Sequence, residues 1–217
     1  NEQKDSLYLS FLNRLEKKYA TNPLSAQASF AIAQFYRSRA YQYNPEIFET
    51  HIFKNSNQKA FDICKNIVEK FPKTNSATRA ENLLLEIKQK FLSFEIEENI
   101  IPEDKILTKI NYRNISKVYV RIAAISSKKL HQINKEHRYD EYFARIKENS
   151  TEIKNYEFEL PNDSDFQKHS CELLIDGLPL GSYVVIMSNN PQFKEKNNIV
   201  AYRTFVVTNL SFIQNQS

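Results

Sequence analysis

The chain has 217 residues and a net charge of +4, with 41% apolar residues, 15 Phe and 12 Tyr. This composition is sufficient for a packed core and argues against intrinsic disorder. No run of about 18 apolar residues is present, so the sequence predicts no membrane insertion. The small net charge also argues against a nucleic-acid partner, which requires a concentrated basic surface.

The chain is long enough for one large domain or two ordinary ones. It does not begin with Met and carries no signal-peptide apolar region. We therefore expect a mature or trimmed piece whose targeting segment is missing. Its two cysteines, Cys64 and Cys171, are expected to be buried free thiols in different domains, able to form a disulfide only if those domains pack closely.

Residues 1–92 are predicted to form an antiparallel helical hairpin array. Apolar residues recur at helical spacing in four segments, Leu7–Tyr19, Ser25 to about Tyr43, Asn57–Phe71 and Ala77 to about Phe91. The spacing of Ala60, Cys64, Ile67 and Pro72 is similar to the second helix of a tetratricopeptide repeat. The stretch 44–56 is an insertion into that pattern. Such arrays bind peptides or act as spacers, and the spacer role is favoured here.

Residues 93–217 are predicted to form a seven-stranded antiparallel β-sandwich of immunoglobulin-like architecture, because the apolar period changes to two after Leu92. The expected strands are Phe94–Glu97, closed by Ile100-Ile101-Pro102, then Lys105–Tyr112, Lys117–Ile125, Ile153–Leu160, Ser170–Ile175, Tyr183–Met187 and Ile199–Leu210. Residues 128–148 are rich in charge and are expected to be a long mobile insert with some helix.

Gly177 and Gly181 are the two glycines of the chain, and they flank Leu178-Pro179-Leu180. Glycine supplies positive-φ positions and proline fixes a corner, so the pattern predicts a strand, a tight corner and a strand. Replacing Gly181 with Val is expected to damage folding rather than an activity.

No catalytic, cofactor-binding or metal-binding residue is predicted, and the chain is not expected to be an enzyme. Metal-ligand spacing is absent from the four histidines, His51, His131, His137 and His169. Glu95, Glu97 and Glu98 are expected on a solvated strand edge rather than in a pocket. Two glycines in one corner exclude a phosphate loop and a dinucleotide fingerprint, so no cofactor is expected.

Charged and aromatic side chains alternate at the end of the second predicted helix, at Arg37, Arg39, Tyr41 and Tyr43. This combination is found on platforms that bind peptides or glycans. Ordinary helix surface is the favoured interpretation, and the platform is the alternative.

Three stretches of the second half occur in an informative order: Ile110–Ile115 with Val118–Ile122, then Leu178–Val185, then Phe205–Ser211. They resemble, in turn, the opening strand pair, the corner and the closing strand of macroglobulin-like domains in the bacterial alpha-2-macroglobulin family. Some large members place a helical segment before the first sandwich, in the order seen here.

The resemblance implies a non-catalytic structural fragment, with domains 1–92 and 93–217, of a large cell-envelope protein that entraps and inhibits proteases. Its partners would be further domains of the same chain and, through the whole protein, proteases. Its location would be periplasmic or surface-exposed. The thioester run Cys-Gly-Glu-Gln of the family is not present, since Cys64 precedes Lys-Asn-Ile and Cys171 precedes Glu-Leu-Leu. The alternative is a stand-alone module whose helical array binds a peptide or an envelope partner.

Overall fold

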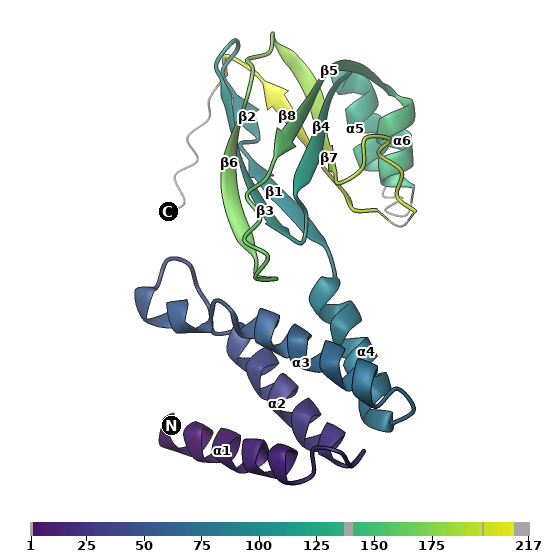
Figure 1. Ribbon diagram of the computed structural model, residues 1–217. Helices are drawn as coiled ribbons and strands as arrows, with labels where there is room; N and C mark the ends of the chain where they lie inside the picture. Colours follow the sequence, from purple (N-terminus) through teal and green to yellow (C-terminus); the bar gives the residue numbers. More distant parts are fainter. Residues whose placement is uncertain (1, 137–140, 197, 211–217) are drawn as a thin grey trace. The chain divides into compact units, whose positions relative to one another are not determined.

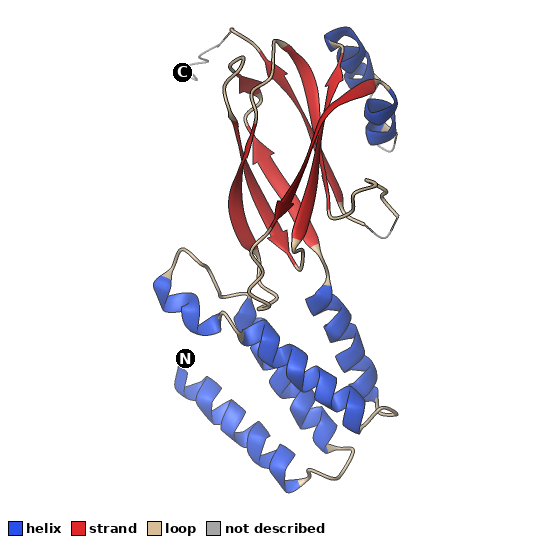
Figure 2. Cartoon of the chain, turned by 45° about the horizontal axis from the view of Figure 1, so that its top comes forward, coloured by secondary structure: helices blue, strands red, loops and turns tan. Residues whose placement is uncertain are grey.

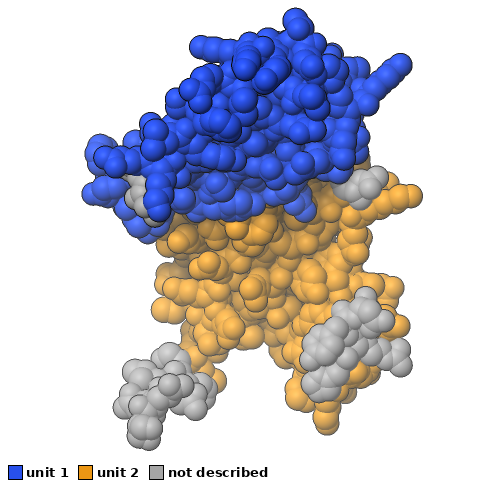
Figure 3. All heavy atoms as spheres, turned by 90° about the horizontal axis from the view of Figure 1, so that it is seen from below, with its two compact units in different colours: residues 1–89, 162–167 blue, residues 90–161, 168–217 orange. Residues whose placement is uncertain are grey.

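The structure is a computed structural model that describes residues 2–136, 141–196 and 198–210. Contacts within the chain define two compact units (Figure 3). Unit 1 comprises residues 1–89 and 162–167, and unit 2 comprises residues 90–161 and 168–217. The α+β class is confirmed. None of the helices in these described ranges is long and apolar enough to cross a membrane.

Unit 1 is helical, and its core uses small side chains. Its elements are α1 (Glu2–Lys18), α2 (Ser25–Ala40), the 3₁₀ helix η1 (Phe48–Phe53), α3 (Ser56–Lys70) and α4 (Asn75–Lys88) (Figure 1). Five alanines of the α2–α3–α4 contact are fully buried, Ala26, Ala33, Ala60, Ala77 and Ala80. Side chains of this size let helix backbones approach closely, so the short helices share one core.

Two helix ends differ from the prediction. The second helix ends at Ala40 rather than Tyr43. The fourth helix ends at Lys88, and Phe91, which the apolar spacing assigned to it, is the first residue of a strand. The backbone leaves the helical region at Gln89, whose φ of −57° and ψ of 124° are extended. Apolar spacing cannot distinguish the last turn of a helix from the first residue of a strand.

Residues 162–167 lie between two strands of unit 2 in the sequence but belong to unit 1. The ring of Phe166 stacks on that of Phe61 in α3, with centroids 4.8 Å apart. The Asn57 side chain donates from Nδ2 to the Phe166 carbonyl oxygen at 2.9 Å. The segment therefore completes the helical core, although the sequence predicts only a polar loop there.

Gln167 fixes the end of this segment against the ends of two helices. Its Nε2 lies 3.4 Å from the Ala40 carbonyl oxygen, 3.4 Å from that of Phe53 and 3.2 Å from that of Lys54. Carbonyls at a helix C-terminus have no partner within the helix. The buried Gln167 amide supplies a donor there.

Unit 2 contains two sheets with eight strands in its described residues (Figure 1). The strands are β1 (Phe91–Ile96), β2 (Asn99–Ile100), β3 (Ile106–Arg113), β4 (Lys117–Ile125), β5 (Ser150–Glu159), β6 (His169–Ile175), β7 (Gly181–Ser188) and β8 (Val200–Val207). One sheet has the order β1-β3-β6 and the other β2-β8-β7-β4-β5. Inward side chains of both form one apolar core that includes Ile110, Val120, Val185 and Phe205.

The predicted count of seven antiparallel strands is wrong. Each predicted strand overlaps an observed one, but Ile100, which was expected to close the first strand, belongs to a separate strand, β2, that pairs with β8 in parallel. It has two residues, Asn99 opposite Val206 and Ile100 opposite Val207. So short a strand shows no alternation, and the sequence pattern therefore misses it.

The described residues of the insert after β4 form two helices, in line with the helix expected there. They are α5 (Ser127–Lys135) and α6 (Tyr142–Glu148), and both lie against the five-stranded sheet (Figure 2). Ile133 and Ile146 are buried with Val184 and Ile186 of β7. Both faces of β7 are thereby covered, which explains why the strand has no exposed position.

The glycine corner is tight for a reason other than the one predicted. Neither glycine has a positive φ. A Cβ on Gly177 would lie 2.2 Å from the carbonyl oxygen of Glu103, in the connection between β2 and β3. The Glu103 amide donates to the Leu178 carbonyl at 3.0 Å. Glycine is required at 177 because two backbones approach each other.

Candidate functional site

The candidate site is an open groove between α2 and α4 of unit 1, with a volume of about 480 Å³. Most of its lining residues fall three or four positions apart on each helix, so that one face of each contributes. The α4 side consists of Arg79, Asn82, Leu83 and Glu86. The α2 side consists of Phe30, Gln34, Arg37 and Ser38, together with Tyr41, which directly follows the helix.

One end of the groove carries a charged network. Arg37 is buried, and its Nη2 donates to Glu86 Oε1 at 2.6 Å while its Nη1 donates to Asn57 Oδ1 at 2.9 Å. The Tyr41 hydroxyl donates to the same Glu86 oxygen at 3.2 Å. The Arg37 guanidinium also lies 4.4 Å from the Tyr41 ring centroid. Charge at this end is thus balanced, and the side chains are held in place.

The other end carries a cation with no ion pair in the described part of the chain. Arg79 is exposed, and its guanidinium carbon lies 4.4 Å above the Phe30 ring. Between the two ends lie Gln34 and Asn82, both exposed. No hydrogen bond of their side-chain amides occurs among the described residues. The groove therefore offers a positive charge and two amides to a ligand.

The four residues of the aromatic and charged platform predicted at the end of α2 have different surroundings in the structure. Arg37 and Tyr41 line the groove, but Arg39 pairs with Asp5 of α1. Tyr43 lies beside His51, with ring centroids 5.9 Å apart. Gln34, Arg79 and Asn82 are absent from the sequence-based candidates. Their spacing places them on helix faces, but only the fold shows that the two faces meet.

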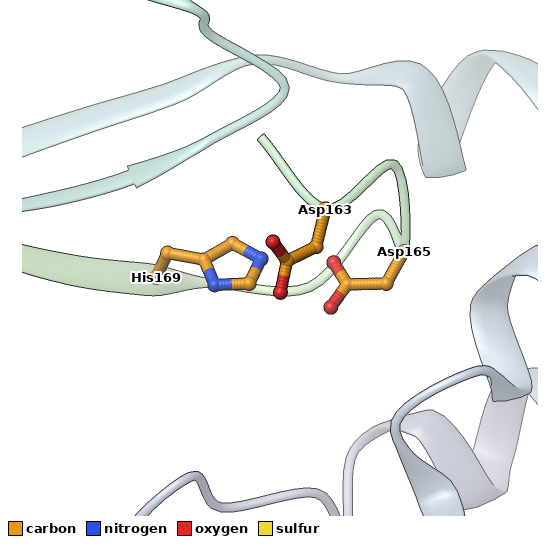
Figure 4. Close-up of side chains that lie close together, drawn as sticks. All are labelled: Asp163, Asp165 and His169. Atoms are coloured by element: carbon orange, nitrogen blue, oxygen red, sulfur yellow. The ribbon is translucent and has the colours of Figure 1, made fainter. Parts of the chain in front are cut away.

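The histidines of the predicted set lie in different elements. His51 is in η1, His131 in α5 and His169 at the start of β6, while His137 lies outside the described residues. Figure 4 draws His169 with Asp163 and Asp165, which precede it on the same stretch of chain.

Each of these three side chains has a partner in its own unit. Asp163 accepts from Lys54 Nζ at 2.7 Å, and Asp165 accepts from the Gln167 amide at 2.9 Å. The His169 ring lies 5.8 Å from that of Tyr112. The spacing of the histidines in the sequence gives no indication of Asp163 and Asp165.

Both cysteines are free thiols, as expected, but their burial differs. Cys64 is fully buried in the core of unit 1, and burial raises the pKa of its thiol to about 12. Cys171 in β6 is half-buried, and burial raises its pKa as well. A thiol with a raised pKa stays protonated at neutral pH and is a poor nucleophile.

No protein-family model matches the chain, and no curated protein matches it. Among solved structures, the CARDB domain of a Pyrococcus furiosus protein, in complex with di-metal ions, is 12% identical, with a TM-score of 0.31 over 55% of this chain and 88% of that one. A native alpha-2-macroglobulin piece from Escherichia coli spanning domains NIE-MG1 is 12% identical, with a TM-score of 0.37 over 57% of this chain and 62% of that one.

A longer piece of the Escherichia coli protein, spanning domains MG0-NIE-MG1, is 14% identical, with a TM-score of 0.37 over 59% of this chain and 42% of that one. The chain thus spans less than two thirds of either alpha-2-macroglobulin piece. Similarity at this level concerns the fold of part of the chain and says nothing of its activity.

Proposed function

We propose that the chain is a non-catalytic structural part of a large envelope protein similar to alpha-2-macroglobulin, which entraps proteases. The ordered resemblance of three stretches in unit 2 supports the family. In this proposal the helical unit is a tetratricopeptide-like spacer. The partners of this part are further domains of the same chain. Proteases are bound by the whole protein, in the periplasm or at the cell surface.

The observation that carries the proposal is the use of residues 162–167 in the core of unit 1. The connection between β5 and β6 leaves unit 2, supplies Phe166 and Gln167 to unit 1, and returns. The buried polar side chains Arg37 and Asn57 are likewise bonded to the chain itself. Satisfied buried networks give a unique, rigid structure, as a scaffold requires.

The test uses the native gene product that contains this chain. We expect a product far larger than 25.5 kDa that, after incubation with an endopeptidase, blocks cleavage of a large protein substrate but spares cleavage of a small chromogenic peptide. A native product ending near Ser217, or one that leaves cleavage of both substrates unchanged, would overturn the proposal.

A second candidate function is peptide capture by unit 1, favoured by the α2–α4 groove. Its volume of about 480 Å³ lies within the range of ordinary ligand sites. It lies between two helices, and an extended peptide is the class of ligand that such an open groove accommodates.

A further inference from the structure

We infer that the α2–α4 groove binds a peptide through a carboxylate, with Arg79 as the anchor. The inference rests on the second candidate function and adds to it the chemistry and direction of the ligand. The carboxylate is that of an acidic side chain within the peptide, because the groove is open and the peptide chain can continue past Arg79.

The charge of the lining favours an anion at one end only. Within the described residues Arg79 has no ion pair, whereas the acidic Glu86 is paired with Arg37 at 2.6 Å. Arg79 and Glu86 are seven residues apart on α4, which corresponds to about 10 Å along the helix axis. A carboxylate beside Arg79 is therefore attracted by an uncompensated cation and lies well away from the Glu86 carboxylate.

The position of Arg79 suits this role. Its guanidinium carbon lies 4.4 Å from the Phe30 ring centroid, and stacking on an aromatic ring holds the guanidinium plane while leaving its edge open. Phe30 is itself buried. The guanidinium edge thus remains available for two parallel N–H bonds to a carboxylate.

The two amides between the charged ends suit a peptide backbone. Each of Gln34 and Asn82 presents one carbonyl acceptor and an NH₂ donor, and a peptide unit presents the complementary pair. Gln34 comes from α2 and Asn82 from α4, so they face the groove from its two walls. The two amides contact the peptide backbone, which is the same in all peptides. The acidic residue that binds Arg79, rather than the rest of the peptide sequence, therefore determines which peptides bind.

The experiment is fluorescence anisotropy at low ionic strength with three labelled hexapeptides and the full chain. The first alternates Ala and Glu and has an amidated C-terminus, the second has Gln in place of Glu and a free C-terminus, and the third has Gln and an amidated C-terminus. We expect the Glu peptide to bind about tenfold or more tightly than either Gln peptide. Tighter binding of the Gln peptide with the free C-terminus would instead show that a terminal carboxylate is the ligand, and would overturn the inference.

Arg79→Ala should abolish that preference, and Arg79→Lys should retain part of it, because Lys keeps the charge without the two-pronged geometry. Arg14→Ala is the matched control. Arg14 is also an exposed arginine stacked on a phenylalanine, 5.8 Å from the Phe11 ring, but it lies on α1 outside the groove. The melting temperature of each variant shows whether it is folded.

Equal binding of the three peptides, or a carboxylate preference that persists in Arg79→Ala, overturns the inference. Neither result contradicts the second candidate function, peptide capture by unit 1. Loss of the preference in Arg14→Ala as well would also overturn it, because the effect would then be general charge. If none of the peptides binds, both the inference and the second candidate function are wrong.

Discussion

Thr108 is a polar residue in an apolar core. It lies on the inner face of β3 between Ile106 and Ile110, is 0% exposed, and its Oγ1 has no hydrogen-bond partner among the described residues. Leaving a buried hydroxyl without a partner costs about 1–3 kcal/mol. Thr108→Val keeps the shape and removes the hydroxyl, so we expect unit 2 to gain about 1 kcal/mol in urea unfolding.

Thr74→Val is the matched control for this substitution. The Thr74 hydroxyl accepts from the Ala77 amide at 3.1 Å and caps α4. The same change there should cost about 1 kcal/mol, because it removes a helix cap. A loss of stability in Thr108→Val would show that its hydroxyl is bonded after all.

Gly177 and Gly181 differ in what surrounds them, and their alanine variants should differ accordingly. A Cβ on residue 177 would lie 2.2 Å from the Glu103 carbonyl oxygen. The backbone at Glu103 cannot move away without breaking the hydrogen bond from its amide to the Leu178 carbonyl. The atoms nearest to a Cβ at 181 belong to the Tyr183 side chain, the first at 3.1 Å. We expect thermal unfolding to show a loss of about 3 kcal/mol or more for Gly177→Ala and about 1 kcal/mol for Gly181→Ala. Equal losses would contradict this account of the corner.

The element most poorly predicted from sequence is the segment 162–167. Its composition, Asn-Asp-Ser-Asp-Phe-Gln, is that of a turn, and Ser164 and Phe166 have the positive φ values of 56° and 57°. A polar loop with one aromatic residue gives no periodic signal, because its contacts are with helices about a hundred residues earlier in the chain. The four helices and seven of the strands were predictable, since each carries its own apolar period.

Gln167 offers a test of this segment at the level of a single element. Its Nε2 donates toward three carbonyls, and the Asp165 carboxylate accepts from its backbone amide at 2.9 Å. Gln167→Glu replaces the donor with an anion among these oxygens. We expect the helical unit to lose about 3 kcal/mol in urea unfolding followed by circular dichroism.

The pH dependence of Gln167→Glu has a definite sign. Burial among oxygens raises the folded-state pKa of the new carboxyl, so the folded protein holds a proton that the unfolded chain releases as pH rises. The deficit is therefore greater at neutral pH than in mild acid. The matched control is Gln27→Glu, at an exposed position of α2, which should change stability by less than about 0.5 kcal/mol. A deficit independent of pH would contradict the proposed environment.

At the scale of the whole molecule, the candidate site was only partly predicted because its two walls come from helices far apart in the sequence. The prediction near Tyr41 found one wall of the groove, because Arg37 and Tyr41 stand close together in sequence. The other wall, including Arg79 and Asn82, comes from a helix that sequence analysis treated only as a source of core residues. Helix faces can be read from spacing, but the pairing of two faces is a tertiary property.

The helical unit as a whole should be incomplete without the segment contributed from between β5 and β6. A fragment of residues 1–89 lacks the Phe166 ring stacked on Phe61 and the Gln167 amide at the helix ends. We expect this fragment to melt at a lower temperature than the helical signal of the full chain. A synthetic peptide of residues 160–169 should raise its melting temperature with increasing concentration, since a ligand of the folded state stabilises it by mass action. The same peptide with Ala at positions 166 and 167 should not. If the fragment is as stable as the helical unit in the full chain, residues 162–167 are a surface loop and not part of its core.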